Sequence, residues 1–182
     1  MDSRSYAASE YLVNTNETER KQIMLCEKVL GTLKDEKFRG LPVDYVDIEW
    51  YEAFTKIHRK VSSQGEDIGI RLDNEVLQKG INQDDVLYAD KEKVIAVNIP
   101  PCEAILVRVR NDHPGQVAKV CYEIGNRHAV LFWGTEENTF LTPFNQPLME
   151  LLSKLHGVTA EKVMTKFNFD QAISSSINNH HH

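Results

Sequence analysis

The chain has 182 residues, 41% of them apolar, and a formal net charge of −6. This apolar content supports a packed core and argues against a disordered polymer. The acidic balance argues against a nucleic-acid binder, because neutralising phosphates needs a basic surface. The length lies between one large domain and two small ones.

The chain carries no signal for a membrane or for export. No stretch is long and apolar enough to span a bilayer, and residues 1–22 lack the apolar middle of a secretory signal. Three cysteines without a C-x-x-C pair do not suggest a disulfide framework, which favours a reducing compartment. We therefore expect a cytoplasmic protein.

The first half predicts a flexible extension followed by a β-rich domain. Residues 1–22 show no sustained periodicity and many turn-forming residues, as expected of a flexible N-terminal extension. From residue 23 to 100, short segments rich in β-branched and aromatic residues predict strands. The expected strands are 43–50, 54–61, 68–72, 86–88 and 93–99, with a hairpin turn at 62–67. Pro100 and Pro101 predict a domain boundary.

The second half, residues 101–170, mixes strands with two amphipathic helices. The strands are expected at 103–110, 129–134, 139–144 and 158–169. Apolar residues at 117, 120, 121 and 124 mark one face of a first helix, with Asp112 as its expected N-cap. We expect Gly125 to end that helix, because glycine accepts a left-handed conformation. Apolar residues at 148, 151, 152 and 155 repeat the pattern in a second helix.

These elements predict an α+β fold class. An N-terminal all-β domain is followed by a C-terminal ferredoxin-like domain, because the order β-α-β-β-α-β is typical of that sandwich. Residues 171–182 are polar and predict a flexible tail ending in histidines.

Histidines are the candidate metal ligands. His128 follows the expected helix stop, where an imidazole can reach solvent or a twin subunit, and imidazole suits nickel, zinc and copper. An isologous dimer would present His128 twice. The alternative is that His128 interacts with the C-terminal end of the helix, as cations do.

The terminal run of His180, His181 and His182 is also open to two interpretations. Histidine clusters bind divalent metals, but a run that ends the chain is also typical of an expression tag. The patterns around His58, His113 and His156 predict solvated surface, and Cys121 lies on the apolar helix face as a small hydrophobe. We find no nucleophile elbow and no phosphate-binding loop, and thus no case for an enzyme.

Several segments resemble the UreE family of urease accessory proteins. The segment 120–128, Val-Cys-Tyr-Glu-Ile-Gly-Asn-Arg-His, resembles the family's Gly-Asn-Arg-His signature. The resemblance continues through 43–50, 65–72, 94–98, 142–144 and the leucine-rich helix, and so covers about residues 43–157.

The resemblance implies a nickel metallochaperone that delivers nickel to apo-urease during assembly of the urease metallocentre. It implies a peptide-binding-type domain at 23–100, and a metal-binding and dimerisation domain at 101–170. His128 corresponds to the family's interfacial ligand, and His180, His181 and His182 are candidate auxiliary ligands for nickel, with zinc or copper as further cargo. The implied partners are a second copy, the accessory GTPase and the apo-urease assembly complex.

Two departures from the family pattern limit the ligand set. Many relatives carry a His-x-His pair where this chain has Phe144-Asn-Gln-Pro-Leu148, and many end in a longer histidine-rich tail. We therefore expect one shared site with little storage capacity. The alternative function is a ferredoxin-like regulatory or small-ligand-binding module without metal delivery, because a fold by itself does not decide function.

Overall fold

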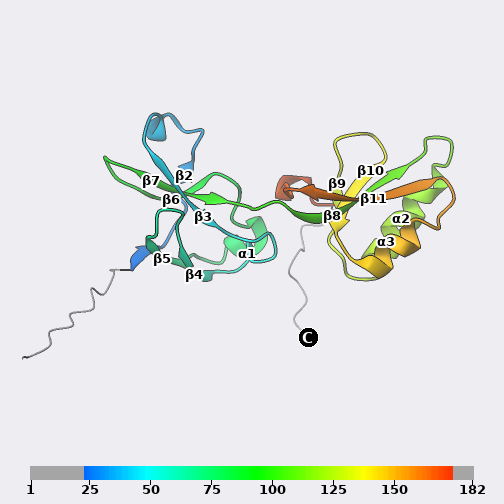
Figure 1. Cartoon of the computed structure of the whole chain (residues 1–182), viewed down its shortest axis with the longest axis horizontal. Coiled ribbons are helices and arrows are strands. Elements are labelled where there is room, and N and C mark those ends of the chain that lie inside the picture. Colours follow the sequence, from blue (N-terminus) through cyan, green and yellow to red (C-terminus); the bar gives the residue numbers. More distant parts are fainter. Residues whose placement is uncertain (1–22, 174–182) are drawn as a thin grey trace, which may run out of the picture.

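The computed structural model describes residues 23–173, whose strands form three sheets (Figure 1). Two sheets come from residues before Pro100, with strand orders β1-β5-β4 and β2-β6-β7-β3. The expectations for residues 1–22 and for the tail after Ile173 lie outside the described residues. The bounds of the first-half elements are β1 Met24–Cys26, β2 Gly31–Thr32, β3 Val43–Asp47, β4 Ile57–Val61, β5 Asp67–Arg71, β6 Asp85–Ala89 and β7 Val94–Asn98, with a 3-10 turn η1 at Glu36–Phe38 and a short helix α1 at Val76–Lys79.

Strand β7 is buried on both faces. Its residues from Val94 to Val97 are fully buried, which explains the unbroken apolar run in the sequence. Val94 and Ala96 pack with Phe38 and Val86, whereas Ile95 and Val97 face the larger core of this half.

The expected hairpin at 62–67 is confirmed. β4 and β5 pair antiparallel, and Gly65 in the turn has a φ of 88°. The prediction that His58 lies on the solvated surface is wrong, since its side chain is buried and its Nε2 lies 3.0 Å from the carbonyl oxygen of Thr55. Burial lowers the pKa of His58.

The second half contains the expected order β-α-β-β-α-β. Its elements are β8 Cys102–Val109, α2 Gly115–Gly125, β9 Phe132–Trp133, β10 Thr139–Pro143, α3 Gln146–Leu152 and β11 Val158–Thr165, and the sheet order is β11-β8-β10-β9. Both helices cover one face of this sheet (Figure 1), where Val120, Ile124, Leu148 and Leu152 pack on β8 and β10. The mixed, strand-rich α+β class is confirmed.

The chain after β11 differs from the expectation. The last strand ends at Thr165 instead of residue 169, and residues 166–173, here named the strap, turn back and form a 3-10 turn η2 at Phe169–Gln171. Strands β1 and β2 and helix α1 were also not predicted. They are two to four residues long, too short for a periodic pattern to be read.

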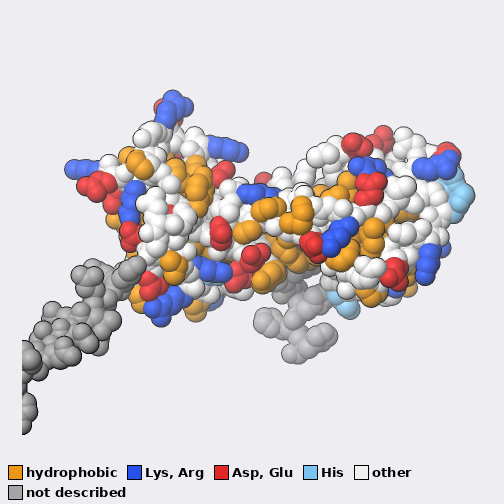
Figure 2. Space-filling model, viewed as in Figure 1, with side chains coloured by type: hydrophobic (Ala, Val, Ile, Leu, Met, Phe, Trp, Pro, Cys, Tyr) orange, Lys and Arg blue, Asp and Glu red, His pale blue; other side chains and the backbone are white. Residues whose placement is uncertain are grey.

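The strap joins the two halves of the chain. Phe167 stacks on Phe132 of β9 at 4.5 Å between ring centroids and meets Trp50 edge-on at 5.4 Å. Phe169 meets Phe54 at 5.0 Å. These rings belong to one core cluster that also contains residues of β5, β7 and β8, so apolar packing crosses the segment at Pro100 and Pro101. Figure 2 shows apolar side chains on the surface of this narrow middle part.

Within residues 23–173, no helix has the length and apolar character needed to cross a membrane.

Replacing Phe132 by alanine should lower the free energy of unfolding by about 3–5 kcal/mol, because the ring is buried and its loss leaves a cavity under Phe167. Guanidinium unfolding followed by tryptophan fluorescence would measure the loss. Ile57→Thr is the control, since Ile57 is 73% exposed and should change stability by no more than about 0.5 kcal/mol. Equal effects of the two changes would contradict this account of the core.

Candidate functional site

Helix α2 ends in a hydrogen-bonded motif that places His128 in a left-handed conformation. The N–H of His128 donates to the carbonyl of Gly125 at 2.9 Å, and the N–H of Ala129 donates to the carbonyl of Ile124 at 3.3 Å. This pair of bonds is the Schellman motif, in which the first residue beyond the helix cap, here His128, adopts the left-handed conformation. The φ of His128 is 54°, and Ile124 and Ala129 share one apolar cluster, as the motif favours.

The expectation that Gly125 ends the helix is therefore wrong in its mechanism. Gly125 is the last residue of α2, but it is not among the residues with positive φ. The helical turn continues to Arg127, whose N–H donates to the carbonyl of Ile124 at 3.1 Å, and the reversal falls on His128. A sequence pattern favours glycine at such a reversal, which is why the histidine was not recognised as the residue that makes it.

The surroundings of His128 favour a cation. His128 is exposed, and it lies beyond the C-terminal end of α2, where helix carbonyls carry partial negative charge. The neighbouring guanidinium of Arg127 folds back along the helix and donates from Nη1 to Oε2 of Glu123 at 2.7 Å. This ion pair offsets the one positive charge next to His128 in sequence.

The strap places Ala172 and Ile173 against the segment that directly follows His128 in the sequence. The N–H of Ile173 donates to the carbonyl of Leu131 at 2.8 Å, and Ala172 forms an antiparallel bridge with Phe132. Leu131 is three residues beyond His128, a span of at most about 11 Å. His180, His181 and His182 lie outside the described residues, but His180 follows Ile173 by seven residues, which can span up to about 25 Å.

One copy of residues 23–173 does not assemble a metal site. In this part of the chain no three His, Cys, Asp or Glu side chains are grouped so that they could hold an ion. Helix α3 begins where relatives are expected to carry a His-x-His pair, and here Asn145 instead caps the helix by accepting from the N–H of Leu148 at 3.1 Å.

Two further histidines, His113 and His156, lie together near the N-terminal end of α2. The rings of His113 and His156 meet edge-on at 4.7 Å between centroids, and the His113 ring covers Gly157. His113 Nδ1 lies 2.7 Å from Asp112 Oδ1, and hydrogen bonds from His113 and Arg110 lower the pKa of Asp112 to about 2. Asp112 was expected to cap α2, but the N-cap is Pro114, without a side-chain bond. The pair and its carboxylate fasten two loops together.

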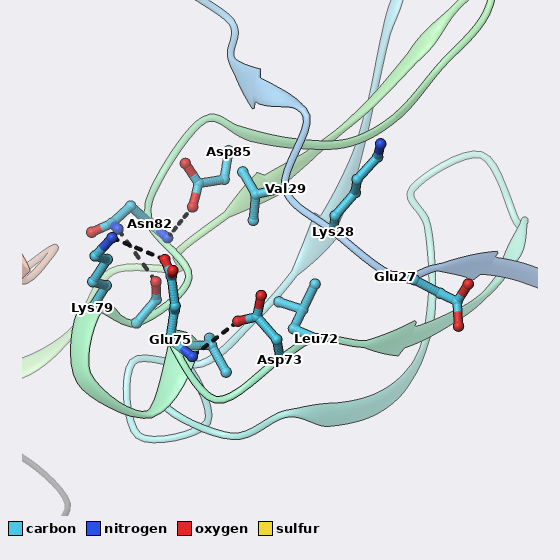
Figure 3. A pocket seen from close by; sticks show the side chains of 11 residues that line it. Glu27, Lys28, Val29, Leu72, Asp73, Glu75, Lys79, Asn82 and Asp85 are labelled. Atoms are coloured by element: carbon cyan, nitrogen blue, oxygen red, sulfur yellow. Dashed lines mark hydrogen bonds and ion pairs between the residues drawn. The ribbon is translucent and has the colours of Figure 1, made fainter.

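The first half contains a cavity of about 330 Å³ that the sequence did not indicate (Figure 3). Asp85 lies in its wall and accepts from the N–H of Asn82 at 2.8 Å, and burial raises the pKa of this carboxyl. Glu75 pairs with Lys79 at 3.0 Å. The wall combines apolar and charged side chains of both signs: Glu27, Lys28, Val29, Leu72, Asp73, Glu75, Val76, Lys79, Gly80, Asn82 and Asp85. These residues come from two stretches far apart in the sequence, 27–29 and 72–85, so no contiguous motif marks the cavity.

Comparisons with known proteins agree across both halves. Residues 26–100 match the family described as "UreE urease accessory protein, N-terminal domain", and residues 104–182 match the corresponding C-terminal domain. The chain is 40% identical over 154 residues to the urease accessory protein UreE of Helicobacter pylori strain G27, covering 85% of this chain and 88% of that protein. It is 46% identical over 132 residues to UreE of Acetivibrio thermocellus, covering 72% of this chain and 81% of that protein.

Replacing His128 by glycine should raise the free energy of unfolding by about 1 kcal/mol, because glycine adopts positive φ without the penalty that a side chain brings. Urea unfolding in the presence of a chelator would measure the change. Lys119→Gly, an exposed position inside α2, is the matched control and should lower stability by about 1 kcal/mol. A loss of stability in the His128 variant would show that the imidazole supports the fold.

Proposed function

Because this chain belongs to the UreE family of urease accessory proteins, we propose that it is a metallochaperone that binds nickel and delivers it to apo-urease. Membership of the family gives it a role in urease maturation, and it is an accessory protein and not an enzyme. Nickel is the cargo, with zinc and copper as competitors for imidazole ligands. The primary ligand is His128.

The left-handed conformation of His128 is the observation that carries this proposal. Glycine would fill that position at lower energy, so a histidine there costs stability. Residues whose backbone is held in such sparsely populated regions of φ and ψ cluster at functional sites. The cost is understandable if the imidazole is needed to bind a metal, and the partial negative charge of the helix end favours a divalent cation.

A second copy of the chain completes the site. One imidazole binds a metal weakly, and a two-fold contact between C-terminal halves brings two copies of His128 together. Tyr122 supports a contact on this side of α2, since it is 66% exposed and aromatic side chains are enriched at interfaces. Two imidazoles leave positions on nickel for other ligands, because nickel accepts more than four nitrogen or oxygen donors.

His180, His181 and His182 supply those auxiliary ligands. Ile173 is bonded to Leu131, three residues after His128, so the histidines that follow Ile173 lie within chain reach of the shared site. Ligands on a tether can leave one at a time, so the complex can pass nickel to a partner without losing its primary ligands first.

The two halves divide the work. The C-terminal half, which we assign to the ferredoxin-like class from its element order, binds metal and dimerises. The β-rich N-terminal half is a peptide-binding-type domain that contacts the accessory GTPase and the apo-urease complex. We place this delivery in the cytoplasm. The rival function, a ferredoxin-like regulatory or small-ligand module, gains no support from the cavity, because that cavity lies in the N-terminal half.

Replacing His128 by asparagine should weaken nickel binding at least about a hundredfold, because loss of a ligand exceeds the 10–100-fold cost of losing an outer-shell partner. Asparagine tolerates positive φ, so the helix end should persist. Calorimetry on the wild type should give one nickel for two chains, and light scattering should give a dimer for both proteins. Histidine must be deprotonated to bind metal, so wild-type affinity should fall on acidification, and the variant should lose most of this dependence.

His156→Asn is the matched control, an exposed histidine at the other end of α2 that should leave nickel affinity unchanged. If the His128 variant bound nickel with wild-type affinity, His128 would not be the primary ligand. A wild-type protein that does not respond to nickel would favour the regulatory module.

Ending the chain at Asn179 should weaken nickel binding without abolishing it, if His180, His181 and His182 complete a site founded on His128. Calorimetry on the shortened chain should show a surviving site of reduced affinity. Unchanged affinity would mean that the tail contributes no ligand, and complete loss would mean that the tail is the primary site.

A further inference from the structure

We propose that the cavity of the N-terminal half is a binding site for an alkylammonium group, the chemistry of a free aliphatic amine and of a lysine side chain. The ammonium group bonds to the carboxylates of Asp73 and Asp85, and the aliphatic stem lies on the apolar part of the wall. This site goes beyond the proposed function, because its residues belong to the half that contains neither His128 nor helix α2.

The cavity has the size and the mixed wall of a small-molecule site. Its volume of about 330 Å³ lies at the small end of the range for ligand pockets, about 300–1,000 Å³. Val29, Leu72 and Val76 form the apolar part of the wall, and Leu72 and Val76 also belong to the core of this half. An aliphatic stem that covers this surface gains free energy, because it removes apolar area from water.

The wall also carries two carboxylates without a counter-cation. Asp73 Oδ1 accepts from the N–H of Glu75 at 2.9 Å, and Asp85 Oδ2 accepts from the N–H of Asn82 at 2.8 Å. Among residues 23–173, neither carboxylate takes part in an ion pair. The negative charge of both side chains is therefore available to a ligand.

The two lysines of the wall do not supply the missing charge. Lys79 Nζ donates to Oε2 of Glu75 at 3.0 Å, and Lys28 extends away from the Asp85 carboxylate (Figure 3). Burial raises the pKa of the Asp85 carboxyl, and the neighbouring charge of Asp84 raises it as well. A cation bound beside Asp85 offsets the cost of keeping this carboxylate charged.

An organic cation fits this wall better than a metal ion does. Calcium and magnesium take about six or more oxygen ligands, whereas the part of the chain that the structure describes groups no three His, Cys, Asp or Glu side chains that could hold an ion. An ammonium group offers three N–H donors and forms strong bonds to carboxylates. Its stem also covers the apolar surface, which a metal ion would leave exposed.

The first test is titration of the full-length protein with cadaverine, pentylamine and pentanol, followed by amide NMR spectra. These probes share one aliphatic chain and carry two, one and no ammonium groups. Both amines should shift the amide signals of residues 27–29 and 72–85. Pentanol should bind at least about tenfold more weakly than pentylamine, because it lacks the charged hydrogen bond.

The second test removes one charge from the wall. Asp85→Asn should weaken pentylamine binding at least about tenfold, while the new amide oxygen can still accept from the N–H of Asn82. Asp170→Asn is the matched control, since it removes the same charge from an exposed position on the strap and should leave binding unchanged. Asp73→Asn should also weaken binding, and it tests the proposal even if Asp85→Asn does not fold.

A further probe distinguishes the two sources of the ammonium group. Nα-acetyl-lysine methylamide presents lysine as it occurs inside a protein chain. Tighter binding of this compound than of cadaverine would identify a lysine of a partner protein as the ligand. Tighter binding of cadaverine would identify a free aliphatic amine.

Three outcomes would overturn the proposal. They are equal binding of pentanol and pentylamine, equal effects of Asp85→Asn and Asp170→Asn, and signal shifts that spare the cavity residues. The second would mean that the net charge of −6 attracts cations to the whole surface. The nickel site is tested separately, because these titrations contain no metal and pentylamine should bind the His128→Asn variant as it binds the wild type.

Discussion

The stacking of Phe167 on Phe132 is the contact on which the arrangement of this chain depends. Phe132 belongs to a two-residue strand at the edge of the C-terminal sheet, and Phe167 follows the strand at its other edge. Both rings share a core cluster with Ala104 of β8, and Phe167 meets Trp50 from the N-terminal half. Apolar packing therefore continues from one half into the other, and the segment at Pro100 and Pro101 is not a free linker.

The same contact orders the segment that follows His128. Residues 129–132 run from the end of α2 to the stacked ring of Phe132, and Ile173 and Ala172 bond to this segment from the other side. The end of α2 therefore fixes the backbone before His128, and the strap fixes the segment after it. His128 itself is exposed, so a partner could reach it.

A tension between stability and function runs through the site. The left-handed position of His128 keeps the protein below the stability that glycine would give it there. The proposed function gives a reason for this cost, because a metal carrier needs a ligand that stays open to a partner.

The sequence by itself determined the strand-rich first half and the two amphipathic helices, and it indicated His128 as a candidate ligand. Periodicity reports which side chains face a core, and the family signature at 120–128 is contiguous. Only the three-dimensional structure decided that His128, and not Gly125, reverses the chain, because that reversal depends on the bonds from the His128 N–H to Gly125 and from the Ala129 N–H to Ile124. It also decided the burial of His58, the cavity around Asp85 and the path of the strap. The cavity and the path of the strap arise from contacts between residues distant in sequence, and a local pattern carries no information about which distant side chains will meet.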